Sequence, residues 1–501
     1  MKKSARFIVA ILILCCVLLP TFVACNNGAK GETGGDKLVI YNWEDYIDIE
    51  VNHETGKTLL DEFADYYKSK TGRSLSITYT TFDTNETMMT KVLKGDANVD
   101  LICPSEYSIE KLLTAGCLLN HNDVKAEIQP ELDQYGISLD RISSIKSASG
   151  EYQWGNIDPE IMSVISNMFN QITTSNGKVC DMTEYMVPYM WGTLGILYNT
   201  AKVSLQELEE YGWGVLWNAQ NNEELEDMIL MKDSVRDTYA AAIFYMYEYD
   251  LLHGTSYLPE KYKSYSVQEL INCTDDEMVL AAEKVLAEQR NHISGYEVDF
   301  GKDDMINEIV YADFAWSGDA LWAIDEGGYD EETDTYQLGY YIPKVASNIW
   351  YDGWCIPTSV NNKLAAMMFI DYMCDPMSSV RNSNAIGYSS ATDKNLLKAN
   401  EDVCAYLENN EYDVEEYFSN TGRYPDFANE GDTYYQKFGV MRDFGSRNDV
   451  VVNMWQRAKS GSGVETSLWW IVLIIVGAIG IAVGAYFIVQ ALKRRPRVIK
   501  K

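Results

Sequence analysis

The chain has few of the residues that most enzymes use for metal binding or nucleophilic catalysis. Only four histidines occur among its 501 residues, and they show no HExxH motif or other metal-ligand spacing. The sequence also lacks a P-loop, a GxSxG motif and the glycine pattern of a dinucleotide-binding turn. We therefore expect no metal, no cofactor and no enzymatic activity.

Positive charge is scarce as well. Asp and Glu number 74 against 41 Lys and Arg, so the formal net charge is -33. Nine of the basic residues lie in the terminal segments 1–25 and 469–501, which contain no acid, and without them the charge of the middle of the chain is -42. A surface this acidic repels phosphate backbones and attracts cations. Nucleic acid is therefore not expected as a partner, and a cationic ligand is favoured.

The ten cysteines show no CxxC spacing. Seven of them lie beyond residue 25, and this odd number in an exported chain does not support a disulfide framework. The spacing does not support a zinc site either. We expect most of these cysteines to be buried as small apolar side chains.

Both ends of the chain contain an apolar segment of a kind that proteins use at membranes. Residues 1–25 combine a basic start, an apolar run over 7–23 and the pair Ala24-Cys25, which predicts a secretory signal and resembles a bacterial lipoprotein signal. That resemblance implies that Cys25 is lipidated; the alternative is an ordinary signal peptide or an uncleaved anchor. Residues 469–492 carry no charge and predict a C-terminal transmembrane helix, since about 20 apolar residues cross a bilayer. The basic tail 493–501 would then be cytoplasmic, and the acidic middle would lie outside the cell membrane, extracellular or periplasmic.

Between the two ends, residues 26–36 form a linker and residues 37 to about 460 form the folded part. The runs 38–41, 75–79 and 99–103 are typical of short buried strands, whereas 59–70 and 87–93 show helical spacing of apolar residues. This alternation predicts βαβ units and an α/β fold with a largely parallel sheet. Ligands bind such sheets at the carboxyl ends of the strands.

Aromatic residues stand next to carboxylates in the segments that follow predicted strands. This pairing occurs in residues 42–46, 104–107, 316–319 and 349–353. Aromatic faces attract ammonium groups, and carboxylates form charge-assisted hydrogen bonds with them. A box of both suits an alkyl polyamine. The structural alternative stays open at this point, because with 12 Trp, 35 Tyr and 74 acids such neighbours also arise by chance.

Six motifs in chain order are more specific: 41–47 (YNWEDYI), 80–86 (TTFDTNE), 104–107 (PSEY), 187–193 (VPYMWGT), 316–319 (WSGD) and 386–388 (IGY). Together they resemble the spermidine/putrescine-binding proteins of bacterial polyamine ABC importers, over most of residues 37–460. The resemblance implies an α/β, two-lobe periplasmic-binding-protein fold (type II-like), here with one C-terminal transmembrane helix added. Lobe 1 would comprise residues 37–193 and 351–397, and lobe 2 residues 194–350 and 398–462, with the ligand held in the cleft between them.

The resemblance also implies a function and a set of binding residues. The protein would be a membrane-anchored receptor that captures spermidine and/or putrescine and delivers it to an ABC permease and its ATPase. The implied ligand-binding residues are Trp43, Trp316 and Trp350 as ring walls, Tyr46, Tyr107 and Tyr388 beside them, Ser105 as a hydroxyl, and Asp45, Asp237, Asp319 and Asp352 as the acids.

Two alternatives remain open from the sequence. Glu44 stands where the family usually has a small polar residue, so the same fold could bind another cationic amine or a cationic peptide. An anchored glycan hydrolase that uses two of the many acids is the alternative from a different class. The choice between spermidine and putrescine is open as well.

Overall fold

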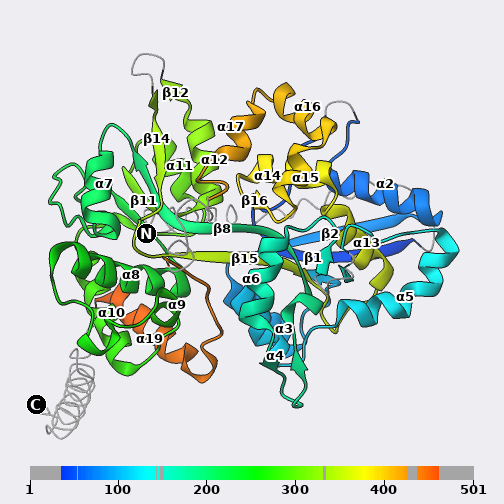
Figure 1. Ribbon diagram of the computed structural model, residues 1–501, viewed down its shortest axis with the longest axis horizontal. Helices are drawn as coiled ribbons and strands as arrows, with labels where there is room; N and C mark the ends of the chain where they lie inside the picture. Colours follow the sequence, from blue (N-terminus) through cyan, green and yellow to red (C-terminus); the bar gives the residue numbers. More distant parts are fainter. Residues whose placement is uncertain are drawn as a thin grey trace, which may run out of the picture. The chain divides into compact units, whose positions relative to one another are not determined.

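Two long antiparallel strands, β8 (Met186–Asn199) and β15 (Ser347–Cys355), lie side by side in the middle of the main sheet (Figure 1). The computed structural model describes residues 35–52, 55–142, 144–146, 152–330, 335–425 and 437–461. The order of strands in the sheet is β10-β9-β11-β8-β15-β3-β1-β2. The first part of β8 pairs with β15 and β16, and its last part pairs with β11 and β14. The sheet therefore has two halves that share these strands.

The first half is built on parallel strands, as the alternating sequence predicts. Strand β1 (Asp36–Trp43) pairs in parallel with β2 (Leu75–Phe82) and with β3 (Leu101–Ile102), while β16 (Ser389–Ser390) pairs with β8. Leu38 and Ile40 of β1 join one buried apolar cluster, and Tyr41 joins another, because successive side chains of a strand point to opposite faces. The helices of this half are α2 (Leu59–Thr71), α3 (Asn85–Lys94), α4 (Glu106–Thr114), α5 (His121–Tyr135), α6 (Pro159–Phe169), α13 (Lys363–Met373), α14 (Pro376–Ile386), α15 (Lys394–Lys398), α16 (Glu401–Asn409) and α17 (Val414–Ser419).

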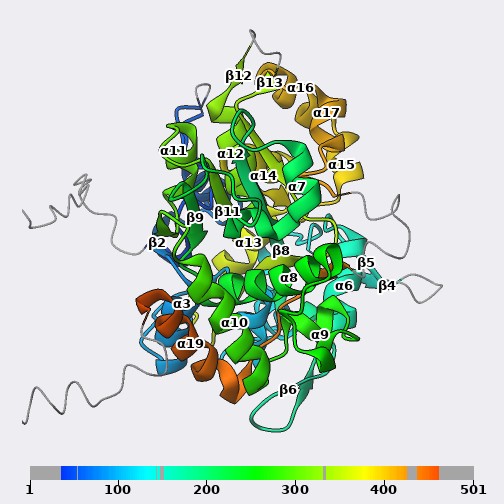
Figure 2. The ribbon, with the colours of Figure 1, turned by 90° about the vertical axis from the view of Figure 1, so that its left-hand side faces the viewer.

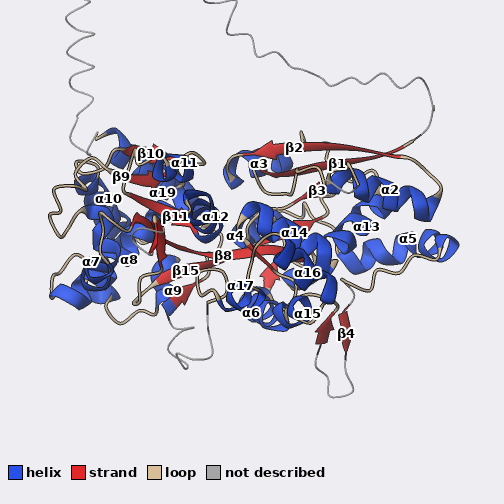
Figure 3. Ribbon diagram, turned by 90° about the horizontal axis from the view of Figure 1, so that it is seen from above, coloured by secondary structure: helices blue, strands red, loops and turns tan. Residues whose placement is uncertain are grey.

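The second half lies at the other end of β8, as the view from above shows (Figure 3). Strand β9 (Ile229–Lys232) pairs in parallel with β10 (Gly295–Glu297) and β11 (Ala312–Trp316), and β14 (Leu338–Tyr341) pairs with β8. Trp213, Phe244 and Phe314 are fully buried in its main apolar cluster. Its helices are α7 (Leu205–Tyr211), α8 (Val235–His253), α9 (Val267–Ile271), α10 (Asp276–Gln289), α11 (Gly301–Ile306), α12 (Ser317–Gly327) and α19 (Asn448–Ser460), of which α8, α10 and α19 contact one another (Figure 2).

Shorter elements complete the described chain. Strand β17 (Phe438–Gly439) pairs in parallel with the start of β15, so a third segment runs beside the two shared strands. Two-stranded ribbons are formed by β4 (Ser144–Lys146) with β5 (Tyr152–Trp154), β6 (Ile172–Thr173) with β7 (Val179–Cys180), and β12 (Tyr329–Asp330) with β13 (Thr335–Tyr336). Short 3-10 helices occur at Met182–Glu184, Gly212–Trp217, Glu260–Tyr262 and Gly445–Arg447.

The local structure that the sequence predicts for the first half is confirmed. The runs 38–41 and 75–79 lie within β1 and β2, the run 99–103 contains β3, and the patterns at 59–70 and 87–93 lie within α2 and α3. Helix α2 begins where Thr58 and Asp61 form a capping box, and it ends at Gly72, whose φ of 72° suits a residue without a Cβ. Capping and apolar spacing thus act together to fix this helix.

The predicted fold class included a C-terminal transmembrane helix, and this part of the prediction is corrected. Within the part of the chain that the structure describes, every helix is too short or too polar to cross a membrane. The predicted span 469–492, the tail 493–501, the signal segment 1–25 and Cys25 all lie outside the described residues. The mixed α/β periplasmic-binding-protein architecture stands without that helix.

The segment 398–425 bears on the boundary between the predicted lobes. Helices α16 and α17, expected in lobe 2, contact α14 and α15 of the first half. Tyr417 and Phe418 of α17 lie in the same buried apolar cluster as Tyr41 of β1. We therefore propose that lobe 1 comprises residues 37–193 and 351–425, and that lobe 2 comprises residues 194–350 and 437–461.

The cysteines in the described residues are free thiols. Cys103, Cys180, Cys355 and Cys374 are buried, and Cys117, Cys273 and Cys404 are partly exposed. The four buried cysteines therefore agree with the prediction that most cysteines are buried as small apolar side chains.

Candidate functional site

A pocket lies where the two halves of the sheet face each other, and we call it the acidic pocket. It encloses about 940 Å³ of space free of protein atoms, part of it open to solvent. Its lining contains eleven carboxylates but only two lysines. The carboxylates are Glu44, Asp45, Asp83, Glu86, Glu106, Asp233, Asp237, Glu297, Asp299, Asp319 and Asp352, and the lysines are Lys232 and Lys302.

The topology brings these side chains together because the carboxyl ends of strands from both halves meet at the pocket. Trp43 ends β1 and Asp83 follows β2, while on the facing half Lys232 ends β9 and Trp316 ends β11. Asp299 lies two residues beyond β10. This arrangement agrees with the rule that ligands bind parallel sheets at the carboxyl ends of their strands.

Aromatic rings form the walls of the pocket. The ring centroids of Trp350 and Tyr388 lie 5.4 Å apart, and those of Tyr46 and Tyr388 lie 5.2 Å apart, both in edge-on orientations. Trp43 contacts Phe82 with a centroid distance of 4.7 Å. Rings held in this way present their faces to alkyl chains and to ammonium groups.

Asp352 is the most deeply buried of the acids that the sequence predicts as ligands. Its exposed fraction is 4%, and its Oδ1 atom has no hydrogen-bond partner among the described residues. Burial raises the pKa of Asp352 to about 7, although the nearby hydroxyls of Ser105 and Tyr46 act in the opposite direction. The pairing between β15 and β8 shifts register between Asp352 and Gly353, and such bulges commonly redirect a side chain. A buried charge is costly unless it is paired, so this carboxylate favours the binding of a cation.

Asp237 approaches the pocket from the first turn of α8. Burial raises its pKa, while the hydroxyl of Ser234 and the indole of Trp316 lower it. The backbone N–H of Asp237 donates to Ser234 Oγ at 3.4 Å, which caps the helix. Asp237 and Asp352 come from different halves, and the negative charge of Asp237 raises the pKa of Asp352. A cation bound between the two carboxylates would offset their repulsion and favour the ionised form of each.

Asn85 organises the wall around the first turn of α4. Its side chain donates to Ser105 Oγ and to Tyr107 Oη, both at 3.0 Å. Glu106 is fully buried and accepts a hydrogen bond from the backbone N–H of Tyr351 at 3.0 Å. Burial raises the pKa of Glu106 to about 8, and that hydrogen bond partly offsets it. Ser105 and Tyr107 are thereby fixed in position at the pocket.

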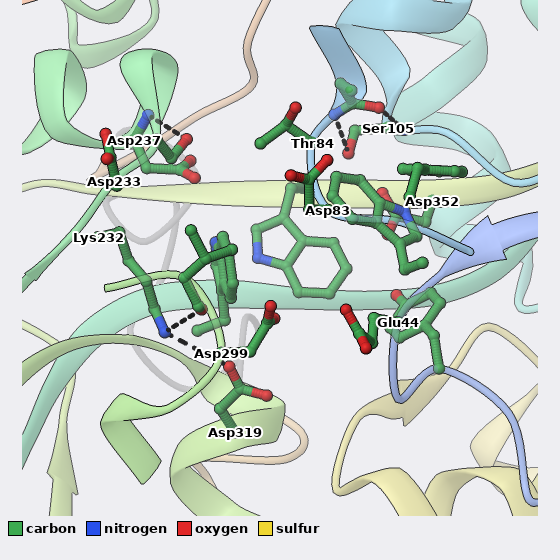
Figure 4. A pocket seen from close by; sticks show the side chains of 18 of the residues that line it. Glu44, Asp83, Thr84, Ser105, Lys232, Asp233, Asp237, Asp299, Asp319 and Asp352 are labelled. Carbon is green, nitrogen blue, oxygen red and sulfur yellow. Dashed lines mark hydrogen bonds and ion pairs between the residues drawn. The ribbon is translucent and has the colours of Figure 1, made fainter. Parts of the chain in front are cut away.

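Asp319 differs from Asp352 because it already has cationic partners. Its Oδ2 atom lies 3.5 Å from Lys232 Nζ, and its Oδ1 atom lies 4.0 Å from Lys302 Nζ. Tyr388 also donates its hydroxyl to Oδ1 at 3.0 Å. Lys302 reaches Asp45 of the opposite half at 3.4 Å. Figure 4 shows Lys232, Asp299 and Asp319 gathered on one side of the pocket, with Asp352 and Glu44 on the other.

A profile of the family described as bacterial extracellular solute-binding protein matches residues 62–403 of the chain. The chain belongs to this family. Members bind solutes rather than transform them, so the prediction of a non-enzyme is confirmed, and the glycan hydrolase alternative is set aside. The acidic pocket is therefore the candidate solute site of an extracellular solute-binding protein.

Several relatives of this solute-binding protein have names that specify a ligand. The putrescine-binding periplasmic protein PotF of Escherichia coli is 24% identical over 71% of this chain and 77% of its own length. The spermidine/putrescine-binding periplasmic protein of Salmonella typhimurium is 23% identical over 77% of this chain and 84% of its own length.

Solved structures show the same fold. The spermidine/putrescine ABC transporter substrate-binding protein PotD of Streptococcus pneumoniae is 25% identical with a TM-score of 0.51, and the alignment covers 85% of this chain and 100% of that protein. The TpPotD lipoprotein of Treponema pallidum has a TM-score of 0.54 at 16% identity, over 85% of this chain and 99% of that protein.

All the residues that the sequence predicts as ligand contacts line the acidic pocket of this solute-binding protein. They are Trp43, Asp45, Tyr46, Ser105, Tyr107, Asp237, Trp316, Asp319, Trp350, Asp352 and Tyr388. Their role in binding stays a prediction.

Other lining residues were missed from the sequence. Asp299 is the clearest example, since burial beside Asp319 raises its pKa to about 6. Lys232, Glu86 and Glu297 also line the pocket. The available signal was position: Lys232 ends a strand and Asp299 closely follows one, where the fold predicts ligand contacts.

Proposed function

We propose that this solute-binding protein captures a polyamine, spermidine or putrescine, in the acidic pocket and delivers it to an ABC permease and its ATPase. The observation that carries this proposal is a pocket with aromatic walls in which eleven carboxylates face two lysines. A flexible alkyl chain suits the rings, and ammonium groups suit the carboxylates. The names of the curated relatives agree with this ligand class.

A metal ion is a weaker candidate for the same pocket. Ca²⁺ needs six to eight oxygen ligands close around one point. In the described part of the chain, no group of three or more His, Cys, Asp or Glu side chains converges in that way. The carboxylates are instead spread along the pocket, and an elongated cation with separated charges can contact several of them.

Calorimetric titration of the purified full chain with putrescine and with spermidine tests the proposal. We expect one-to-one binding of at least one of them and a matching rise in melting temperature, since a ligand that binds only the folded state stabilises it. Neutral diols of the same length, such as 1,4-butanediol, serve as the control and should produce no heat. Absence of binding by every amine would refute the polyamine assignment and leave the fold unaffected.

Polyamine affinity should weaken as the pH falls from 7 to 6. Burial raises the pKa of Asp352 to about 7 and that of Asp299 to about 6, so both carboxyl groups gain protons in this range. Only the ionised forms attract ammonium groups, and the loss of affinity should be roughly tenfold. Titrations at pH 6, 7 and 8 measure it. The variant Asp352→Asn should show a shallower dependence, and an equally steep one would assign the effect to another group.

The sequence patterns at the start of the chain extend the proposal to the location of the protein. We propose that residues 1–25 are a lipoprotein-type signal and that Cys25 carries the lipid. These residues lie outside the described part, so the support is the sequence pattern alone. Mass spectrometry of the mature amino terminus tests it, and an unmodified Cys25 would overturn it.

A further inference from the structure

Lys232 is a buried cation inside a pocket that otherwise gathers acids. It is the last residue of β9 and pairs in register with Glu297, the last residue of β10. Its exposed fraction is 1%. Buried lysines are rare unless they are paired, so its surroundings should show why an ammonium is held there.

The contacts of Lys232 are those that a bound alkylammonium would make. Its Nζ atom forms an ion pair with Glu297 and lies 3.5 Å from Asp319 Oδ2. The same atom lies 4.5 Å from the centroid of the Trp316 ring, within the range of a cation–π interaction. A carboxylate pair and an indole face thus surround one ammonium group that belongs to the chain itself, and Figure 4 labels Lys232 and Asp319 of this group.

The acidic neighbours of Lys232 keep its ammonium group protonated. Burial alone would lower the pKa of Lys232, but the charges of Glu297, Asp313 and Asp319 outweigh burial and raise the pKa. Lys232 is therefore cationic in the unliganded protein. Lys302, at 4.0 Å from Asp319 and 3.4 Å from Asp45, adds a second cation at the same end of the pocket.

At the opposite end, no lysine or arginine is among the described residues that line the pocket. Asp352 forms no ion pair with any described residue, and its Oδ1 atom has no hydrogen-bond partner among them. Trp350 supplies a ring wall on that side, and Tyr388 extends from the Trp350 ring to Asp319, to which its hydroxyl donates. An incoming amine therefore finds an unpaired carboxylate at Asp352 and an already neutralised one at Asp319.

We propose that Lys232 acts as a tethered ammonium that fills the Trp316–Asp319–Glu297 end of the acidic pocket and so selects short diamines over longer polyamines. The proposal rests on the proposed function, since it assumes that the pocket binds amines. Putrescine has two ammonium groups, whereas spermidine carries a third on an additional aminopropyl arm. In this protein the place for the third charge is taken by a side chain. Lys232 is thus a specificity-determining residue.

Affinities of the full chain for putrescine and spermidine, measured by calorimetry for the wild type and for Lys232→Ala, test the proposal. The wild type should bind putrescine more tightly. Lys232→Ala removes three methylenes and the ammonium, leaving Glu297 and Asp319 without that cation. The ratio of spermidine to putrescine affinity should then rise at least about tenfold, because a third ammonium can replace the lost charge.

Two further variants make the result decisive. Lys344→Ala removes a lysine of the exposed pair with Glu209 outside the pocket, and the affinity ratio should not change. Lys232→Ala combined with Glu297→Gln keeps the buried charge balanced and keeps an oxygen for the Gly301 N–H, in case the single variant folds poorly. The ratio should rise in this double variant as well.

The outcomes separate the two proposals. If no form of the protein binds any amine, the proposed function fails. If amines bind but the wild type prefers spermidine, or the ratio stays unchanged when Lys232 is removed, the tethered-ammonium inference is overturned while the polyamine function stands.

Discussion

Asp352→Asn is expected to weaken polyamine binding by about 2–5 kcal/mol, a loss of roughly 30-fold or more. Asp352 is buried, and its Oδ1 atom has no hydrogen-bond partner among the described residues, so its charge is available to an ammonium group of the ligand. The asparagine has the same size but leaves that ammonium buried without a counter-charge, which costs several kcal/mol. Calorimetric titration at pH 8, where the carboxyl group is mostly ionised, gives the largest difference.

The same variant should not lose stability when unliganded. Burial raises the pKa of Asp352 to about 7, so the folded protein holds this proton more tightly than the unfolded chain does. The stability of the unliganded protein therefore falls as the pH rises from about 4 to about 7, and removal of the charge avoids that loss. The control Asp303→Asn changes an exposed acid at the mouth of the pocket and should leave affinity nearly unchanged. Equal losses in both variants would point to net charge rather than to a contact at Asp352.

Arg381→Met is expected to lower the free energy of unfolding by about 3–5 kcal/mol. Arg381 is buried in α14 and donates from Nε and Nη2 to Asp48 Oδ2 at 3.1 and 2.9 Å, and from Nη1 to Glu62 at 2.6 Å. The methionine fills similar space but leaves the buried Asp48 carboxylate without its cation. Urea denaturation of both proteins, with equal slopes, measures the difference.

A matched control for Arg381 is available on the surface. Lys398→Met breaks a pair with Glu415 in which both side chains are largely exposed, and it should change stability by less than about 1 kcal/mol. Arg381 also fixes the segment after β1, because Asp48 lies three residues beyond Asp45 and its N–H donates to Asn382. Polyamine affinity should therefore fall with Arg381→Met as well. A variant as stable as the wild type would show that the Asp48 carboxylate finds another partner or water.

The parts of the fold that depend on local pattern could be predicted from the sequence. Strands β1, β2 and β3 and helices α2 and α3 follow from short apolar runs and helical spacing, which are properties of neighbouring residues. The placement of α16 and α17 could not be predicted in this way. They contact α14 and α15 through apolar side chains such as Tyr417, and nothing local distinguishes that contact from one with the other half. The run at 469–492, predicted as a transmembrane helix, lies outside the described residues, and within them no helix is long and apolar enough to cross a membrane.

In the site as well, residues within sequence motifs could be predicted, whereas contacts between residues far apart in the chain could not. Trp43 and Ser105 could be identified because each lies in a motif that resembles a known family, and Asp352 because it matches an acid of that family. The pair formed by Lys232 and Glu297 could not, because 65 positions separate these residues and only the register of β9 with β10 brings them together. From the sequence alone, Lys232 is an ordinary lysine beside an aspartate. The charge balance of the pocket is therefore a property of the sheet topology.

The continuity of β8 and β15 has a mechanical consequence. Because β8 pairs with strands of both half-sheets and β15 lies along it, a rotation of one half against the other would twist these strands, and that twist would cost elastic free energy. Trp350 and Asp352, which face the pocket, are themselves part of β15. A cation that contacted both halves would therefore act on these strands directly, and their stiffness would oppose any closing rotation.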